Sequence, residues 1–136
     1  MTKPVAAYVP AVVSGNLVFT AGQLPFVDGA LSATGKVGTE VSPDDAVGYA
    51  RTAVLNALAA AQSVIGSLDR VTRVVKVVVF VASMPEFTGQ PAVANGASTV
   101  LGEIFGEAGA HARSALGVAV LPLDAPVEVE LILEFA

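Results

Sequence analysis

The valine-rich run from Val71 to Ala82 constrains the fold of this chain most. β-branched side chains lose rotamer freedom in a helix and pack well on a pleated surface, so the run predicts a β-strand. Its near-continuous apolar character is typical of a strand that is buried on both faces. Its most apolar stretch, Val74 to Ala82, is interrupted by Lys76 and is far shorter than the ~20 apolar residues of a membrane-spanning helix. We therefore expect a sheet packed between other layers and no membrane partner.

A further strand is indicated from Val127 to Phe135, because apolar residues occupy every second position there. The positions between them are mostly glutamates, namely Glu128, Glu130 and Glu134. A strand with this period turns one face to the core and the other to water or a partner. The segment from Arg113 to Leu121 is predicted to be the strand before it.

Two helices are expected between the strands. Ser42 suits a helix N-cap and Pro43 suits the first helical position. Apolar residues then recur at three- and four-residue steps as far as Gly66, which is a helix stop signal. The segment Ser83–Glu86 repeats the capping pattern, so it predicts a second helix that starts there and runs to about Gly106.

The segment 11–35 predicts an antiparallel meander. Turn signals at Ser14–Asn16 and Asp28–Gly29 contain residues that tolerate a positive φ. The order of hairpins, helix, strand, helix and two strands indicates an α+β fold in which two helices cover one face of a mixed sheet. No linker, repeat or low-complexity tract divides the chain, so a single domain over residues 1–136 is expected.

Composition adds an expectation about assembly. Hydrophobic residues make up 54% of the 136 residues and charged residues 14%, against roughly 25% charged residues in ordinary soluble domains. A chain of this size cannot hide so much apolar surface inside itself. The partner that we expect to cover the excess is another copy of the chain.

The same counts disfavour several other partners. A net charge of −5, with Arg70, Arg73 and Lys76 as the only basic cluster, makes nucleic acid an unexpected partner. The absence of cysteine excludes disulfides and thiol chemistry. The N-terminal region lacks the apolar core of a signal peptide, so a cytoplasmic location is expected. Neither metal-ligand spacing nor a glycine-rich dinucleotide motif occurs, so no metal or cofactor is expected.

Two segments of the chain resemble a known family. Residues Tyr8–Gln23 contain a tyrosine, a Gly-Asn turn, an apolar strand and a small-Gly-Gln triplet. Residues Ala112–Ala115 read Ala-Arg-Ser-Ala, and Leu121-Pro122 and Val127–Glu130 follow them. With a helix, a valine-rich strand and a helix between them, these segments are similar to the reactive-intermediate deaminase family. That family is also called Rid or YjgF and is labelled endoribonuclease L-PSP.

The resemblance implies a chorismate-mutase-like fold of the bacillus type, with about six strands, that assembles into a homotrimer with clefts between subunits. It also implies hydrolysis of reactive 2-imino or enamine acids to 2-keto acids, with release of ammonia and without a cofactor. Arg113 matches the arginine that holds the substrate carboxylate, and Glu128 matches the glutamate that positions the attacking water. The other substrate-binding positions that the resemblance implies are Tyr8, Gly22, Ala115 and Asn95.

This chain departs from many family members at two positions. Ala21 stands where many have a hydroxyl residue, and Ala115 stands where many have a cysteine. The resemblance is therefore to a divergent subgroup.

The residue types suit the implied chemistry. An iminium carbon is already electrophilic, so its hydrolysis needs a carboxylate clamp, a positioned water and a route for protons. The planar fork of arginine meets a carboxylate with two parallel hydrogen bonds. A glutamate can orient and activate water.

Other interpretations of these residues stay open at this point. Arg113 would also fit an ion pair with Glu128 or Glu130 on a neighbouring strand. Tyr8 fits a packing role as well as a ligand role. His111, the sole histidine, fits either plain polar surface or a group that tunes the site or shuttles a proton.

Three functions follow as hypotheses. The first is an imine deaminase whose small-molecule partner is an imino or keto acid. The second is a non-catalytic trimer that binds small carboxylates, motivated by Ala21 and Ala115. The third is an endoribonuclease or translation inhibitor, which the acidic charge balance and the lack of an aromatic and basic surface disfavour.

Overall fold

The computed structural model describes residues 7–136, so the signal-peptide expectation lies partly outside the described residues. The elements follow one another along the chain as β1 (Ala11–Ser14), β2 (Leu17–Thr20), β3 (Phe26–Val27), β4 (Ala30–Leu31), α1 (Pro43–Ile65), η1 (Leu68–Arg70), β5 (Val71–Ala82), α2 (Gln90–Phe105), η2 (Gly106–Gly109), β6 (Ala112–Val118), η3 (Pro122–Asp124) and β7 (Val127–Phe135).

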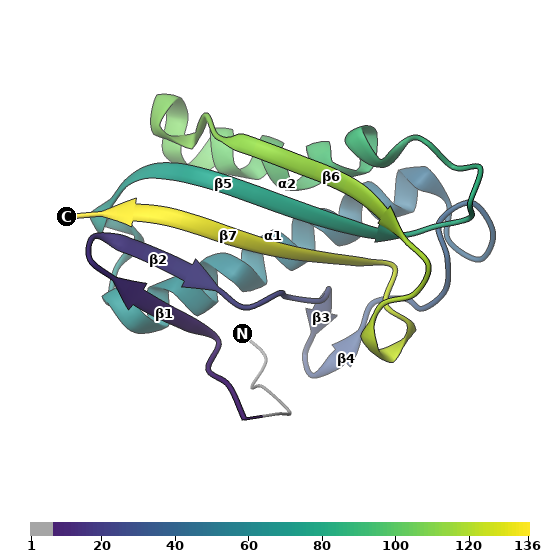
Figure 1. The fold of residues 1–136 in the computed structure, drawn as a ribbon, viewed down its shortest axis with the longest axis horizontal. Coiled ribbons are helices and arrows are strands. Elements are labelled where there is room, and N and C mark those ends of the chain that lie inside the picture. The colour runs from purple at the N-terminus through teal and green to yellow at the C-terminus, as the bar shows by residue number, and fades with distance from the viewer. Residues whose placement is uncertain (1–6) are drawn as a thin grey trace.

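Five strands form one mixed sheet in the order β1-β2-β7-β5-β6 (Figure 1). Strands β5 and β6 run parallel, and the other neighbours are antiparallel. Strands β3 and β4 pair only with each other, which leaves the main sheet one strand short of the six or so expected. The prediction of one meander over residues 11–35 is therefore wrong, because β2 pairs with β7 instead of β3. Both predicted turns are present, with positive φ at Gly15 and at Asp28 and Gly29.

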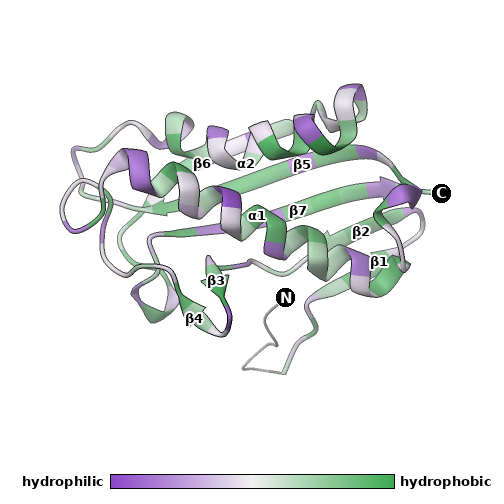
Figure 2. Ribbon diagram, turned by 180° about the vertical axis from the view of Figure 1, so that it is seen from behind, coloured by the Kyte–Doolittle hydropathy of each residue, from purple (hydrophilic) through white to green (hydrophobic). Residues whose placement is uncertain are grey.

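Both helices pack on the same face of the sheet, as predicted, with α1 across β7 and α2 over β5 and β6 (Figure 2). The side chains of β5 and β7 that point toward the helices are fully buried, as at Val77, Val79 and Val129. Figure 2 shows these strands as mostly apolar beneath the helices. No helix among residues 7–136 is long and apolar enough to cross a bilayer.

The other side of the main sheet carries no helix and is called the open face here. Residues on this face, by the register of the sheet, include Phe19, Lys76, Val78, Phe80, Glu128, Glu130 and Ile132. The prediction that β5 is buried on both faces is correct only for the side that faces the helices. On the open face of a single chain, Val78 and Phe80 are partly exposed.

Helix α1 begins and ends as predicted. The Ser42 hydroxyl accepts a hydrogen bond from the Asp45 amide at 3.1 Å, and Gly66 ends the helix with a φ of 88°. The predicted start of α2 at Ser83–Glu86 is wrong, since α2 begins at Gln90 without a side-chain cap. Ser83 instead prolongs the sheet, where its amide donates to the Val118 carbonyl at 3.1 Å.

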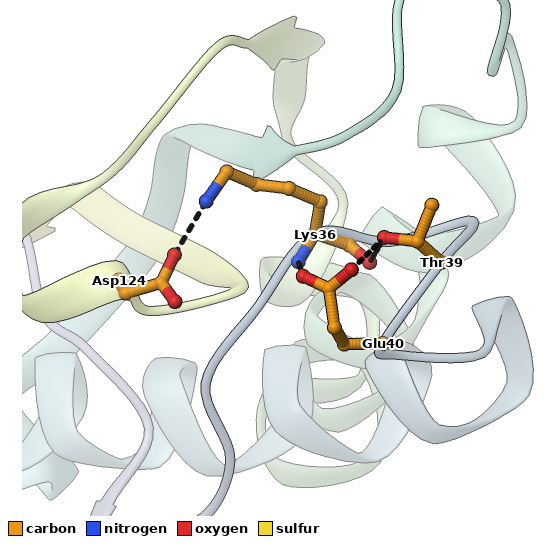
Figure 3. Close-up of polar contacts among 4 residues, drawn as sticks. All are labelled: Lys36, Thr39, Glu40 and Asp124. Carbon is orange, nitrogen blue, oxygen red and sulfur yellow. Dashed lines mark hydrogen bonds and ion pairs between the residues drawn. The ribbon is translucent and has the colours of Figure 1, made fainter.

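The turn that leads into β7 is tied to the loop before α1 (Figure 3). The Lys36 ammonium pairs with Asp124, and the Gly35 amide donates to the Asp124 carbonyl at 2.9 Å. Hydrogen bonds from the Thr39 hydroxyl and the Lys36 amide hold the pKa of Glu40 below its ordinary value. Asp124, joined in this way to Lys36 and Gly35, has a φ of 57°, which an L-residue seldom adopts, and it lies shortly before β7.

Candidate functional site

Arg113 lies on the helix side of the sheet, at its β6 edge. It stands in register with Val77 of β5, which is buried under the helices. Its Nη1 donates to Oδ1 of Asn95 at 2.8 Å and to Oγ of Ser98 at 3.2 Å. Asn95 and Ser98 are three residues apart on α2 and therefore share one helix face. Ala115 follows two residues later on the same face of β6. These four residues are called the arginine half-site.

Glu128 lies on the opposite side of the sheet. It stands in register with Phe80 on the open face, and it is half-buried between the fully buried Val127 and Val129. Its carboxylate lies against the backbone of Gly22, where an added Cβ would be 2.4 Å from Oε2.

Gly22 is held there by the start of β7. The Gln23 amide donates to the Val129 carbonyl at 2.8 Å, and the Val129 amide donates to the Gln23 carbonyl at 2.9 Å. The Ala21 amide donates to the Pro10 carbonyl at 2.8 Å. This bond places the chain just before β1 next to the segment that contains Ala21 and Gly22.

Tyr8, two residues before Pro10, is 50% exposed, so it is not a core packing residue of one chain. Gly22 and Glu128 are called the glutamate half-site, and Tyr8 lies on the chain segment that precedes Pro10.

The environment of Glu128 favours its protonated form. Burial raises the pKa of its carboxyl, and the nearby negative charge of Glu130 raises this pKa further. A carboxylate with a raised pKa is a better proton acceptor near neutral pH than an ordinary one. The raised pKa is a property that suits Glu128 to accept a proton from a water molecule.

The two half-sites do not meet within one chain. Arg113 points toward α2, whereas Glu128 and Glu130 lie on the open face. The interpretation of Arg113 as an ion pair with either glutamate is therefore wrong. The predicted arginine and glutamate can serve one ligand only if different copies of the chain supply them.

His111 is not plain polar surface. It is half-buried, with Nε2 2.8 Å from the Ser98 Oγ and Nδ1 2.6 Å from the Gly109 carbonyl oxygen. Ser98 was not among the residues predicted from the sequence, although it lies three positions beyond Asn95 and so on the same face of a predicted helix.

The basic cluster of Arg70, Arg73 and Lys76 is divided by the fold. Arg70 donates to the carbonyl oxygens of Ile65 at 2.9 Å and Ala136 at 3.0 Å, so it joins the ends of α1 and β7. Lys76 lines a small hollow of the open face with Phe19, Val78, Glu130 and Ile132, among others. Within residues 7–136, no three histidine, aspartate or glutamate side chains are grouped so as to hold a metal ion.

Comparison with known proteins identifies relatives of this sequence and fold. The family profile described as endoribonuclease L-PSP matches residues 1–135. Protein TCP17 of Trypanosoma cruzi is 45% identical over 132 residues, which cover 96% of this chain and 82% of TCP17.

Solved structures share the fold. Atu1372 of Agrobacterium tumefaciens, a protein of unknown function, is similar with a TM-score of 0.94 and 43% identity, over 100% of this chain and 87% of that chain. TdcF of E. coli, solved with bound serine, is similar with a TM-score of 0.70 and 26% identity, over 98% of this chain and 92% of that chain. Because the profile spans nearly the whole sequence and a relative is 45% identical over almost all of it, this chain belongs to the endoribonuclease L-PSP family, also called the Rid or YjgF family.

Proposed function

We propose that this protein hydrolyses reactive 2-imino and enamine acids to 2-keto acids and ammonia. The site would join the arginine half-site of one copy to the glutamate half-site of its neighbour in a homotrimer. One observation carries the proposal: Arg113 and Glu128 lie on opposite faces of the sheet, and neither is used in an ion pair with the other. As part of the same proposal, the enzyme would be one domain per chain and would act in the cytoplasm.

Arg113 is suited to hold a carboxylate. Both of its hydrogen bonds use Nη1 and end on uncharged acceptors, Asn95 and Ser98. The edge formed by Nε and Nη2 therefore remains for the two oxygens of a carboxylate. Bound serine in TdcF supports a ligand of this class, since serine is a small molecule with a carboxylate.

Glu128 is suited to activate the water molecule that attacks the imine. It would accept a proton as the water oxygen attacks the imine carbon, and it would return that proton to the nitrogen of the tetrahedral intermediate. The hydroxyl group of that intermediate then gives its proton to Glu128 as the C–N bond breaks, which releases ammonia and leaves the keto acid. The raised pKa of Glu128 makes it a better acceptor of the water proton than an ordinary glutamate.

The open face supports the assembly. Phe19 is 37% exposed there, and Ile132 and Val78 are only half-buried in one chain. A neighbour packed on this face would cover apolar surface and surround Glu128. Association between copies would thus complete the site. It would also bury the apolar surface that the high hydrophobic content of the chain predicts.

The test uses imines generated in place by an amino-acid oxidase or by a serine or threonine dehydratase, with ammonia release as the readout. The wild-type protein should accelerate release. Arg113→Ala should lower kcat/KM about 100-fold or more, because two charge-assisted hydrogen bonds to the substrate are lost. Arg51→Ala is the matched control, since Arg51 is exposed and its one ion pair within residues 7–136 is with Glu103, at 3.5 Å.

The alternatives give different results in the same samples. Background rates with every imine would overturn the proposal. Calorimetric binding of pyruvate without turnover would favour the carboxylate-binding module. Cleavage of an RNA substrate by nuclease-free protein would favour the endoribonuclease.

A further inference from the structure

The hydrogen bonds around His111 form a chain whose direction can be assigned. The Gly109 oxygen is a carbonyl and only accepts, so the Nδ1 atom 2.6 Å away must carry the proton. In the neutral ring, Nε2 is then an acceptor, and the Ser98 hydroxyl must donate to it over 2.8 Å. The Ser98 oxygen in turn accepts from Arg113 at 3.2 Å.

We propose that His111 is a positioning residue, which acts through Ser98 to orient the Arg113 guanidinium for carboxylate binding. The inference rests on the proposed function, because it assigns Arg113 to a carboxylate. His111 forms its hydrogen bonds with Ser98 and Gly109 and not with Arg113 itself. Its effect is to fix the rotation of one hydroxyl group.

The direction of the Ser98 hydroxyl matters because its hydrogen and its lone pairs lie on different sides of the oxygen. With the hydrogen held by His111, a lone pair faces Arg113. Without His111 the hydroxyl rotates, and in part of its rotamers it turns its hydrogen toward the guanidinium. Asn95 is exposed, so one hydrogen bond to its side chain leaves the guanidinium freer. A less ordered arginine loses more conformational entropy when it binds a ligand.

The far end of the chain of bonds is closely packed. Gly109 is buried, and a Cβ added to it would lie 2.3 Å from the Leu101 carbonyl oxygen on α2. The Gly109 backbone is thus packed against the same helix that carries Asn95 and Ser98. This contact fixes the carbonyl that selects the tautomer of His111.

The first test reads the tautomer directly. His111 is the only histidine, so ¹⁵N labelling of histidine gives a single ring spectrum without assignment ambiguity. With the ring kept neutral at alkaline pH, we expect the Nδ1-H tautomer to dominate and the Nε2 signal to change in Ser98→Ala. A dominant Nε2-H tautomer would overturn the proposal.

The second test measures the affinity for pyruvate by calorimetry, independently of turnover. Ser98→Ala and His111→Ala should each weaken binding about three- to tenfold, the effect of one neutral hydrogen bond. Arg113→Ala should weaken it about 100-fold or more. Thr99→Ala is the control, because it removes an exposed hydroxyl from the next position of α2. His111→Gln should restore part of the affinity, since its amide oxygen can accept from Ser98.

The outcomes separate this inference from the proposed function. Pyruvate binding that depends on Ser98 and His111, without imine turnover, would uphold the inference and remove the deaminase. Wild-type affinity in Ser98→Ala and His111→Ala, with Arg113→Ala defective, would overturn the inference alone. Absence of pyruvate binding to the wild-type protein would overturn the inference together with the arginine clamp. If His111→Ala fails to fold, Ser98→Ala tests the same link with the loss of a single oxygen atom.

Discussion

At the scale of single residues, the glutamate half-site depends on a backbone position without a side chain. The Glu128 carboxylate occupies the space that a Cβ at position 22 would need. The same close approach excludes water from one side of the carboxylate and contributes to the burial that raises its pKa. Gly22 therefore affects both the position and the protonation of Glu128.

Gly22→Ala tests this contact. The new methyl group would meet the far end of a flexible side chain, so the carboxylate moves and the backbone stays. We expect kcat/KM to fall about 10- to 100-fold, since an error of about 1 Å in a reacting group can cost that much. The midpoint of thermal unfolding should change little. Wild-type kinetics in Gly22→Ala would show that the position of this carboxylate does not matter.

Glu128→Gln tests the charge. Because the folded-state pKa is raised, the contribution of Glu128 to stability is present at low pH and is lost as the pH rises through that pKa. Removing the charge should therefore stabilise the folded protein at neutral pH by less than about 1 kcal/mol, as solvent screens a half-exposed group. The gain should vanish in acid, below the ordinary glutamate range.

The activity of Glu128→Gln should fall about 100-fold or more at the pH of the assay. Thermal unfolding at several pH values, with Glu134→Gln as the control on the same strand, measures the stability difference. A gain that stays constant with pH would contradict the assigned direction of the shift.

At the scale of elements, sequence patterns predicted those features that depend on neighbouring residues along the chain. The alternation of β7 predicted that Glu128 points away from the core, and the cap at Ser42 predicted the start of α1. Features that depend on hydrogen bonds between strands distant in the sequence were not predicted. The capping pattern at Ser83–Glu86 does not start a helix, because the Ser83 amide donates a hydrogen bond to β6 instead. The side of the sheet on which Arg113 lies depends on the parallel register of β5 and β6. The sequence of β6 does not alternate between apolar and polar residues, so it does not predict that side.

Contact between the two helices depends on Gly96. A Cβ there would lie 2.0 Å from the Val47 carbonyl oxygen, which is a backbone atom of α1 and cannot turn aside. Gly96→Ala should therefore destabilise the protein by roughly 2–3 kcal/mol, although alanine is the better helix former.

Gly102→Ala is the matched control on the same helix, where an added Cβ meets nothing within 4 Å. It should be neutral or stabilising by up to about 1 kcal/mol. Denaturant unfolding of both variants measures the difference. Equal stabilities would contradict the close packing of α1 on α2. Because Asn95 precedes Gly96, we also expect Gly96→Ala to weaken pyruvate binding.

At the scale of the whole molecule, the sheet separates Arg113 from Glu128, the two groups that the proposed hydrolysis needs. Helices cover the face toward Arg113, and the open face around Glu128 carries apolar residues that composition assigned to a partner. The proposed activity then depends on assembly, since each site would form at an interface between two copies of the chain. The sequence alone could not separate a shared site from an intrachain ion pair, because strand register decides which face each residue takes.

The measurement that tests this account most directly mixes two inactive variants. Arg113→Ala and Glu128→Gln chains are unfolded together in equal amounts and refolded, with each variant refolded alone as the control. If the two residues act across an interface, about a quarter of the sites in randomly mixed assemblies will contain an intact Arg113 and an intact Glu128. The account predicts imine hydrolysis near one quarter of the refolded wild-type rate. A mixture no more active than the separate variants would contradict it.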